Sequence, residues 1–479
     1  MRKHWLILTC LLLPCVLFAQ NEKWDLQRCV DYAVQNNISV KQSDVQARIT
    51  ALQTRLTRGA AIPNLNFNTQ VGGQFGRNID PTSNQFVNNN LFFQSYNLQT
   101  NITLFNWFNV KNQIKAAQAS EEAGRLDIAR VKNDISLNVV AAYLQLLLAS
   151  EQVNIAKAQI ALSDSQRIIT RKQVEAGSMP ELNAAQIESQ LALDSSTYIT
   201  AVSSVQQNKL QLIALLNLDA RQPFEVSIPD VDKIPLPPLS ELDPAELFTI
   251  ASTTQPLQQV DSFRIISGQY SVKAARGAMY PALTAFGSLG SNYSNGYKLF
   301  NQSPTGSVTD SIAYTTVNGG KYPVFATSPV YTTSTTKIGY WKQISDLQFG
   351  QSVGVQLNVP IFNGRQLRTN YERAKLNVES SKLQLALDNQ TLQQNIYTAR
   401  ANAEAAIQKF NSNQKASAYA EYANELSRKR YEIGILSTSD YLIVQNNLAT
   451  ARFNLASSRY DYIFRVKLLE YYKFGAVQL

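Results

Sequence analysis

The residues that most often do chemistry in proteins are nearly absent from this chain of 479 residues. Its one histidine is His4, and two of its three cysteines, Cys10 and Cys15, also lie near the amino terminus. If that segment is removed, Cys29 is the only thiol left and no histidine remains. Ser-His-Asp and Cys-His catalysis, His-ligated metals and internal disulfides are then excluded. The sequence also has no G-x-x-x-x-G-K-[ST] loop and no paired-carboxylate motif, so we expect neither an enzyme nor a bound cofactor or metal.

The first residues have the pattern of a secretory signal peptide. Arg2 and Lys3 are followed by an apolar run from Trp5 to Phe18, and Ala19 provides the small residue before a cleavage site. We therefore expect residues 1–19 to be removed. An alternative is a lipoprotein with Cys15 as its lipidated first residue. No other run reaches about 18 apolar residues, so no membrane-spanning helix is predicted.

The rest of the chain is polar but poor in charge. Only 16% of the residues are charged, and loss of Arg2 and Lys3 lowers the formal net charge from +9 to +7. Asn, Gln, Ser and Thr supply the polarity instead. The basic residues are spread along the chain without a cluster, so we expect no nucleic-acid partner.

The sequence repeats itself. Leu104-Phe105-Asn106 recurs as Ile361-Phe362-Asn363, and Glu175-Ala176-Gly177 recurs as Glu432-Ile433-Gly434, both with an offset of 257. Arg58-Gly59-Ala60 recurs as Arg276-Gly277-Ala278 with an offset of 218. The difference of 39 residues indicates an insertion in the second half, between Pro281 and Ile361.

These repeats predict the organisation of the chain. Each half should contain a helix, an extended hairpin, a very long helix, a turn and another long helix. The first structural repeat is expected over residues 20–218 and the second over 244–474, with a tail at 475–479. A Pro-rich connector at 219–243 separates the repeats and is expected to hold one short strand at Phe224–Ile228.

The extended segments alternate between apolar and polar residues. Leu65, Phe67 and Val71 share one face of the first segment, whereas Asn66 and Asn68 share the other. Segments of this length can span a membrane as strands of a β-barrel, with an amide-rich face toward water. Half-buried hairpins of a soluble protein are the alternative. Six residues are predicted to line the lumen of such a barrel: Asn66, Asn68, Gln99, Asn101, Gln356 and Asn358.

The helical segments are long and have narrow apolar seams. From about Asn109 to Glu175 there is no proline, and apolar residues recur at spacings of three or four from Ile128 to Ile160. A second seam runs from Leu385 to Phe410. Such a seam is buried only against other helices, so we expect helices packed side by side. An ordinary coiled coil would explain this region, but it would not explain the hairpins.

Two motifs connect this order of elements with a known family. Arg430-Tyr431-Glu432-Ile433-Gly434 followed by Asp440 resembles the last helical hairpin of TolC-like outer-membrane efflux proteins, and Val174-Glu175-Ala176-Gly177 resembles its counterpart in the first half. The resemblance covers essentially the whole mature chain. It implies an α+β fold of mainly long helices, in which a homotrimer forms a twelve-stranded outer-membrane barrel and a twelve-helix periplasmic tunnel.

The resemblance also implies a function and partners. The chain would be the passive exit duct of an efflux or type I secretion system. Its partners would be outer-membrane lipid, a periplasmic adaptor protein and an inner-membrane transporter of the RND, ABC or MFS type. The alternative is a structural or adhesive periplasmic coiled-coil protein without channel activity. The cargo cannot be read from the sequence. By topology, residues 290–348 would form an extracellular loop, whose role stays open.

The turns between the long helices are the candidate entrance of the tunnel. In the family this end is closed at rest, and by position Asp440, Tyr431, Arg430 and Glu181 are gating candidates. Leu436 and Ile443 depart from the charged residues of the family, which puts a charge gate in doubt. The alternative for Asp440 is a helix-capping box with Ser437, and Ser178 with Glu181 would form a similar box. Candidates for adaptor contact at the tip are Gly177, Ser178, Met179, Gly434, Ile435 and Leu436.

Overall fold

A computed structural model describes residues 23–80, 82–228 and 237–475. The predicted signal peptide, part of the connector and most of the predicted tail lie outside these residues. The chain has an α+β fold in which helices predominate. It divides into two compact units, and each takes segments from both halves of the sequence. The helical unit comprises the residues up to Thr54, Ala116–Gln269 and those from Lys375 onward, and the strand unit comprises Arg55–Lys115 and Tyr270–Ala374.

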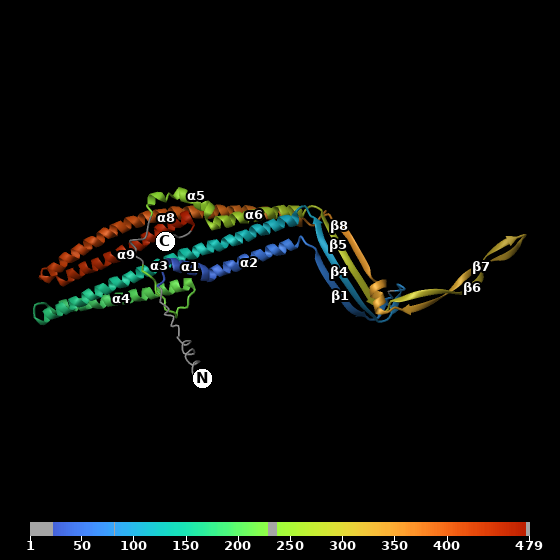
Figure 1. Cartoon of the computed structure of the whole chain (residues 1–479), viewed down its shortest axis with the longest axis horizontal. Helices are drawn as coiled ribbons and strands as arrows, with labels where there is room; N and C mark the ends of the chain where they lie inside the picture. Colours follow the sequence, from blue (N-terminus) through green and yellow to red (C-terminus); the bar gives the residue numbers. More distant parts are fainter. Residues whose placement is uncertain (1–22, 81, 229–236, 476–479) are drawn as a thin grey trace, which may run out of the picture. The chain divides into compact units, whose positions relative to one another are not determined.

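The order of elements follows the predicted one in both halves, except that two helices instead of one come before the strands (Figure 1). Two shorter helices precede the strands in each half, and a long helical hairpin follows them. The helices of the first half are α1 (Leu26–Asn36), α2 (Ile38–Gly59), α3 (Asn109–Glu175) and α4 (Glu181–Leu216). Those of the second half are α5 (Pro244–Thr254), α6 (Pro256–Gly277), α8 (Gln366–Glu432) and α9 (Thr438–Phe474).

The predicted bounds of the first long helix are confirmed. α3 contains 67 residues and, at 1.5 Å per residue, extends about 100 Å. It continues through Gly124, where a Cβ atom would lie 2.8 Å from the hydroxyl oxygen of Thr50 on α2. A second helix thus approaches α3 so closely at Gly124 that a larger side chain would collide with it. The equally long α8 is approached in the same way by α6 at Gly268, next to Val378.

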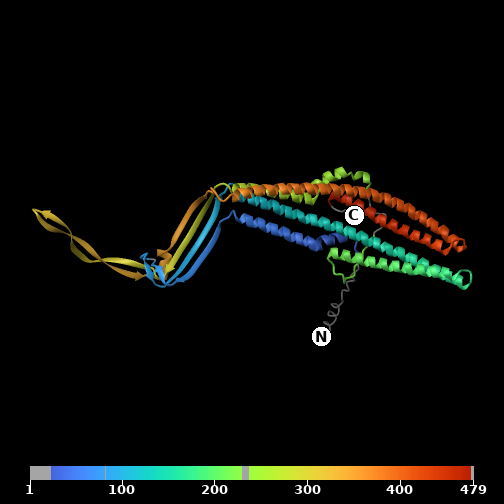
Figure 2. The same cartoon turned by 180° about the vertical axis from the view of Figure 1, so that it is seen from behind.

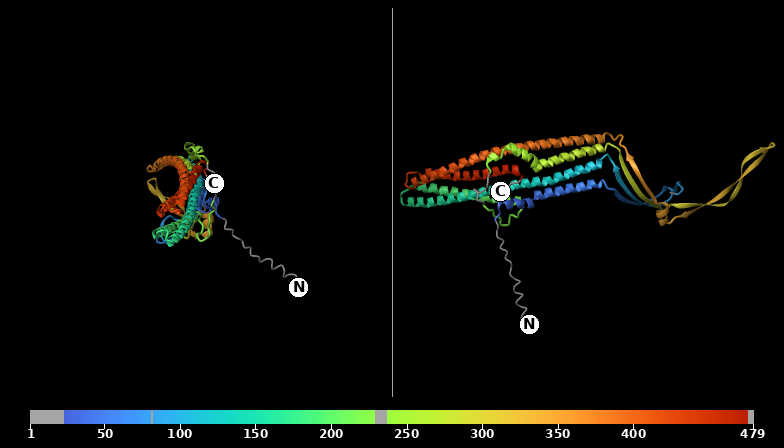
Figure 3. Two further views of the ribbon diagram at one scale, coloured as in Figure 1. Left: turned by 90° about the vertical axis from the view of Figure 1, so that its left-hand side faces the viewer. Right: turned by 45° about the horizontal axis from the view of Figure 1, so that its top comes forward.

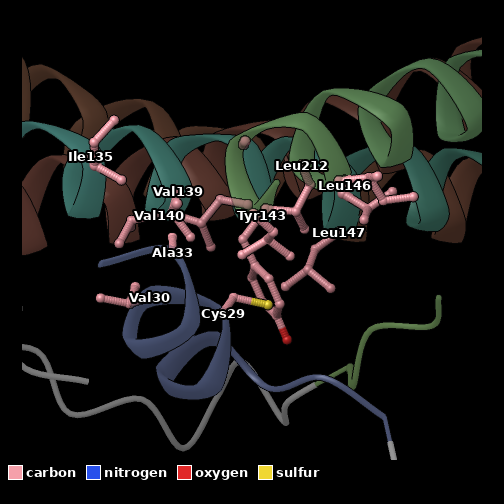
Figure 4. Close-up of a cluster of buried hydrophobic side chains, with 14 of the residues drawn as sticks. Cys29, Val30, Ala33, Ile135, Val139, Val140, Tyr143, Leu146, Leu147 and Leu212 are labelled. Carbon is pink, nitrogen blue, oxygen red and sulfur yellow. The ribbon is translucent and has the colours of Figure 1, made fainter. Parts of the chain in front are cut away.

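The predicted seams form the core of the helical unit. On α3, Ile135, Val139 and Leu146 are buried, and on α8, Ile396 and Ala403 are fully buried. Figure 4 shows the first cluster, in which α1 and α4 pack on α3. One helix, α3, contains a stretch apolar enough to cross a membrane by length and composition, and half of that stretch is buried in the protomer. These residues therefore serve as core in the described part of the chain.

Cys29 and Tyr143 occupy the centre of this cluster. Cys29 is fully buried as a free thiol, and burial raises its pKa to about 12. The Tyr143 hydroxyl donates to the carbonyl oxygen of Ser227 at 2.5 Å, which ties the connector to α3. The prediction of a strand at Phe224–Ile228 is wrong. Only one bridge forms there, between Trp24 and Val226, because no second strand extends the pairing.

The strand unit is built around one antiparallel sheet. Its strands are β1 (Asn64–Gln74), β4 (Leu91–Phe105), β5 (Ala282–Ser294) and β8 (Gly350–Asn358), in the order β1-β4-β5-β8. Figure 2 shows β1 and β8 as the two edges of this sheet. Two short strands, β2 (Arg77–Ile79) and β3 (Phe86–Asn88), lie between β1 and β4 in the sequence.

The two hairpins of this sheet share one register. Leu65 on β1 pairs with Thr100 on β4, and Leu283 on β5 pairs with Leu357 on β8. These positions differ by the same offsets, 218 and 257, that relate the two halves of the sequence. Every described pair of β5 with β8 corresponds in this way to a pair of β1 with β4.

The insertion is a second, separate ribbon of two strands. β6 (Lys298–Val317) and β7 (Gly320–Lys337) pair with each other over their whole length and are exposed (Figure 3). Two short helical segments, α7 (Tyr340–Lys342) and η3 (Gln343–Leu347), follow the ribbon. The buried Gln343 side chain accepts a hydrogen bond from the Ser294 backbone and thereby attaches this segment to β5. The predicted loop at 290–348 is thus mostly regular structure.

Candidate functional site

The two turns between long helices have the same backbone. At the end of α3, Gly177 has a φ of +72°, and at the end of α8, Gly434 has a φ of +75°. The amide of Ser178 donates to the Gln173 carbonyl, and that of Ile435 donates to the Arg430 carbonyl. Both turns are therefore Schellman motifs, in which a left-handed residue closes the last turn of a helix. The turn roles predicted for Gly177 and Gly434 are confirmed.

The helices that leave these turns begin differently. Ser437 caps α9: its Oγ accepts from the Asp440 amide at 3.1 Å, and its hydroxyl donates to the Asp440 carboxylate at 2.7 Å. The capping contact predicted for Asp440 is thus present. The second predicted box is wrong, because Pro180 rather than Ser178 occupies the cap position of α4 and offers no side-chain cap.

The two partners of that second box have other contacts. The Ser178 hydroxyl donates to the Gln173 carbonyl, which belongs to the preceding helix. Glu181 instead receives a hydrogen bond from Arg171 at 2.6 Å. This ion pair is exposed and links the last turn of α3 to the first turn of α4.

Tyr431 is the one gating candidate that is buried. Its ring stacks on Tyr441 of α9 with 4.7 Å between ring centroids. Its hydroxyl lies 3.4 Å from the hydroxyls of both Thr170 on α3 and Thr438 on α9. Tyr431 therefore joins three helices near the turns. Arg430, Glu181 and Asp440 are exposed on the surface of the protomer, as are the tip residues Gly177, Ser178, Gly434 and Ile435, whereas Met179 and Leu436 are half-buried.

Further polar contacts near the turns were not predicted. Asp194 of α4 is buried and accepts hydrogen bonds from the Ser163 hydroxyl of α3 and from the Gln190 amide. Gln190 also reaches Asn446 of α9 at 3.3 Å. Tyr441 is buried too, and this burial raises its pKa. No signal in the sequence distinguishes these residues from surface residues, because their burial depends on how neighbouring helices are rotated.

The sheet of the strand unit has two chemically distinct faces. Because Asn66 pairs with Gln99 and Thr284 pairs with Gln356, the six predicted lumen residues all lie on one face. Leu65, Phe67, Leu289, Val353 and Val355 lie on the other face, and more than two fifths of each of these side chains is exposed. A sheet with water on both sides would not maintain such an exposed apolar face.

Aromatic side chains lie at both ends of the apolar face. At one end, the rings of Trp107 and Tyr280 are 4.9 Å apart, and Phe105 lies 5.5 Å from Trp107. At the other end, the rings of Tyr293 and Tyr340 are 4.8 Å apart, and Trp341 is mostly exposed. Two aromatic bands around an apolar band are typical of a strand region that spans a bilayer.

The family of the chain follows from comparison of its sequence with known families. Residues 30–218 and 339–469 match the family described as outer membrane efflux protein. The chain belongs to this family. The match leaves out the segment that contains β5 and the β6–β7 ribbon.

Two curated relatives are distant in sequence, and both are outer membrane proteins. The chain is 22% identical over 307 residues to the pyoverdine export outer membrane protein OpmQ of Pseudomonas putida. This alignment covers 63% of the chain and 62% of OpmQ. It is 20% identical over 371 residues to the outer membrane efflux protein BepC of Brucella suis, which covers 76% of this chain and 69% of BepC. The aligned region thus spans about two thirds of each relative.

Solved structures have the same fold over nearly the whole chain. The CmeC outer membrane channel of Campylobacter jejuni matches with a TM-score of 0.71 at 18% identity, over 95% of this chain and 86% of that chain. At this identity the likeness establishes the fold, and the roles of individual residues need their own tests.

Proposed function

We propose that the chain is the passive exit duct of an outer-membrane efflux or type I secretion system and works as a homotrimer. Its family gives the location and the general activity, since the members are outer-membrane efflux proteins that reach into the periplasm. The observation that carries the oligomer is the sheet with an exposed apolar face and two unpaired edges, β1 and β8, and the number of three copies follows from the resemblance to TolC-like proteins.

Unpaired edges require more than one copy. In the hydrocarbon region of a bilayer, every backbone amide and carbonyl needs a partner within the protein, so an open sheet is not stable there. Four strands are too few to close a barrel, since the smallest membrane barrels have eight. Three copies of the four-stranded sheet would give a closed barrel of twelve strands, in which β8 of one copy pairs with β1 of the next.

The internal repeat gives the register of that pairing. Because the two hairpins are equivalent under the offsets of 218 and 257, the contact of β4 with β5 should recur between β8 and β1 of the next copy. The pair Ser95 and Asn292 then corresponds to Ser352 and Gln74 of the next copy. Both of these residues would lie on the amide face, where water and a soluble oxidant can reach them.

Disulfide trapping tests this interface. The double variant Ser352→Cys/Gln74→Cys should form covalent dimers and trimers on oxidation, because residues paired across strands have Cα atoms within disulfide range. The matched control Ser352→Cys/Phe75→Cys moves one thiol to the opposite face and should stay monomeric on a denaturing gel. Cys29 contributes little background because it is buried and its pKa is raised to about 12. Equal cross-linking of both variants, or none in either, would reject this barrel.

Conductance separates the duct from the alternative function. The purified full chain, reconstituted in a planar bilayer, should pass ions and should need detergent for purification. A structural or adhesive coiled-coil protein would be soluble without detergent and electrically silent.

The amide residues Asn66, Asn68, Gln99, Asn101, Gln356 and Asn358 would line the lumen. A Gln99→Cys variant should then be blocked by a charged thiol reagent, whereas a Leu98→Cys variant should not.

The helical turns are proposed as the periplasmic entrance. Tyr431 would stabilise the closed form because it joins α3, α8 and α9. Asp440, with Arg430 and Glu181 nearby in the turns, would set the charge of the entrance, since its carboxylate is exposed beyond its cap contact. The exposed residues Gly177, Ser178, Gly434 and Ile435, together with the half-buried Met179 and Leu436, would contact a periplasmic adaptor protein, which joins the duct to an inner-membrane transporter.

Single-channel recording tests the gating role of Asp440. We expect Asp440→Ala trimers to lose block by multivalent cations, and Asp440→Asn trimers to behave the same way. The Asn variant can still accept from Ser437, so it separates loss of charge from loss of the cap. Unchanged conductance and unchanged cation block in both variants would leave Asp440 with a capping role alone.

A further inference from the structure

A cavity of about 530 Å³ lies in the helical unit, away from the turns between the long helices. Four segments line it: α3 with Asp127 and Asp134, the start of α6 with Gln258, α8 with Asp388, and the end of α9 with Tyr471. Its volume is in the range of small-molecule sites in proteins. Neither the family nor the proposed duct assigns a role to it.

The charges around this cavity do not balance. Arg130 pairs with Asp127 at 2.7 Å and with Asp134 at 2.9 Å, and Arg264 pairs with Asp261 at 3.2 Å. Both arginines on the wall are therefore engaged. Asp388 accepts from the amide of Gln384 at 3.1 Å and also lies against the carboxyl group of Asp261. Four carboxylates, those of Asp127, Asp134, Asp261 and Asp388, thus face two arginines, and among them Asp388 has no arginine partner in the described residues.

Behind Asp388 lies a second carboxylate, Asp261, one of whose two oxygens has no hydrogen-bond donor in the described structure. Asp261 is 2% exposed, and its Oδ1 accepts from Arg264. Its Oδ2 has no hydrogen-bond partner in the described structure and lies next to the Asp388 carboxyl group. Burial, followed by the neighbouring Asp388, raises the pKa of Asp261 to about 6. Above this pH two adjacent carboxylates are charged and share one cation, Arg264, so one negative charge stays without a partner.

A second buried group on the cavity wall also lacks a partner. Gln255 is 5% exposed and lines the cavity. Its Oε1 accepts from the Tyr471 hydroxyl at 3.1 Å, but its Nε2 has no acceptor in the described residues. Buried polar atoms in native proteins nearly always have partners. The cavity therefore presents one carboxylate that needs a cation and one amide that needs an acceptor.

We propose that this cavity binds a small organic amine that also carries hydroxyl or carbonyl oxygens, such as an amino sugar. Its ammonium group would donate to Asp388, and one of its oxygens would accept from Gln255. The rings of Tyr471 and Tyr472, together with the aliphatic Leu257 and Leu392, provide the apolar part of the wall. A metal ion fits less well, because no group of three metal-binding side chains occurs among the described residues.

Calorimetric titration of the full chain in detergent with glucosamine tests the proposal. At pH 7.5 we expect saturable binding of glucosamine and none of N-acetylglucosamine, which has a similar shape but no charge. Asp388→Asn should weaken glucosamine binding at least tenfold. Glu379→Gln, an equal change of charge at an exposed position on the same helix, should leave it unchanged.

A second variant distinguishes loss of the site from loss of the fold. Asp261→Asn should retain weaker binding, similar to that of the wild type at pH 5, because it removes the buried negative charge and leaves Asp388 charged. Both Asp388→Asn and Asp261→Asn relieve the repulsion between the two carboxylates, so the melting temperature of each at pH 7.5 should equal or exceed that of the wild type. Absence of glucosamine binding, equal binding of the neutral sugar, or wild-type binding by Asp388→Asn would each overturn the proposal.

The pH dependence provides a further check with a defined sign. The pKa of Asp261 is raised above its ordinary value, so a proton enters the pair as the pH falls through about 6. This proton neutralises the negative charge that would otherwise attract the amine. Glucosamine should therefore bind more weakly at pH 5 than at pH 7.5. The groups that face the pair from other helices are Asp127, Arg130 and Asp134 on α3 and Tyr471 and Tyr472 on α9. In Asp261→Asn the dependence near pH 6 should disappear, and its persistence there would contradict the proposal.

Discussion

The turn from α3 to α4 and the turn from α8 to α9 have the same backbone but different side-chain chemistry. Both close with a left-handed glycine and the same pair of backbone hydrogen bonds. After the glycine, one turn continues through a serine cap and the other through an uncapped proline and an exposed ion pair. The comparison teaches that a repeat retains the glycine that adopts left-handed backbone at the lowest cost, whereas helix caps can be exchanged.

The largest effect is expected from replacing the shared glycines. Gly177→Ala and Gly434→Ala should each destabilise their turn by about 1–2 kcal/mol, the cost of left-handed backbone for a residue with a Cβ atom. A Cβ atom added at either position would have no atom beyond the neighbouring residues within 4 Å, so the expected loss of stability comes from the backbone conformation alone. Hydrogen exchange at the Ser178 and Ile435 amides measures it. A response at only one turn would mean that the two backbones are not equivalent.

A smaller and unequal effect is expected from the two serines. Ser437→Ala should cost about 1 kcal/mol and speed exchange of the Asp440 amide, because it removes the side-chain cap of α9. Ser178→Ala should change little, since Ser178 does not cap α4. As a control, Ser437→Asp should maintain the protection. Equal losses in the two alanine variants would show that Ser178 caps its helix after all.

The smallest effect is expected at the ion pair of Arg171 and Glu181. Both side chains are exposed, so the loss of their attraction in Glu181→Gln should barely change the melting temperature, and added salt should remove the difference. A double-mutant cycle with Arg171→Gln isolates the pairwise coupling. A strong coupling that survives high salt would indicate that the pair is buried by a partner at the turn.

The sequence predicts those parts of the fold that depend on periodicity and on turn residues. The bounds of α3 are correct because no proline interrupts it and Gly177 ends it. The two faces of β1 and β4 are correct because alternation is unbroken over the whole of each strand. The two turns between the long helices are correct because a left-handed glycine, Gly177 or Gly434, ends each preceding helix.

Other parts depend on tertiary packing or on irregular pairing. The β6–β7 ribbon was predicted as a loop, since register shifts between Pro304 and Gly306 and between Ser311 and Ala313 reset the alternation. The partners of Asp194 and Asp261 could not be predicted, because they lie on helices far away in the sequence whose rotation sets which side chains meet. The cavity next to Asp388 was missed for the same reason.

The place of the β6–β7 ribbon has a practical consequence for protein engineering. β5 and β8 retain the same register as β1 and β4, although residues 295–349 separate them where residues 75–90 separate the first pair. Loop closure over the longer segment costs only on the order of 1 kcal/mol more. The junctions at Ser294 and Gly350 are therefore natural grafting points, where a foreign peptide could replace the ribbon without a change in the register of the sheet.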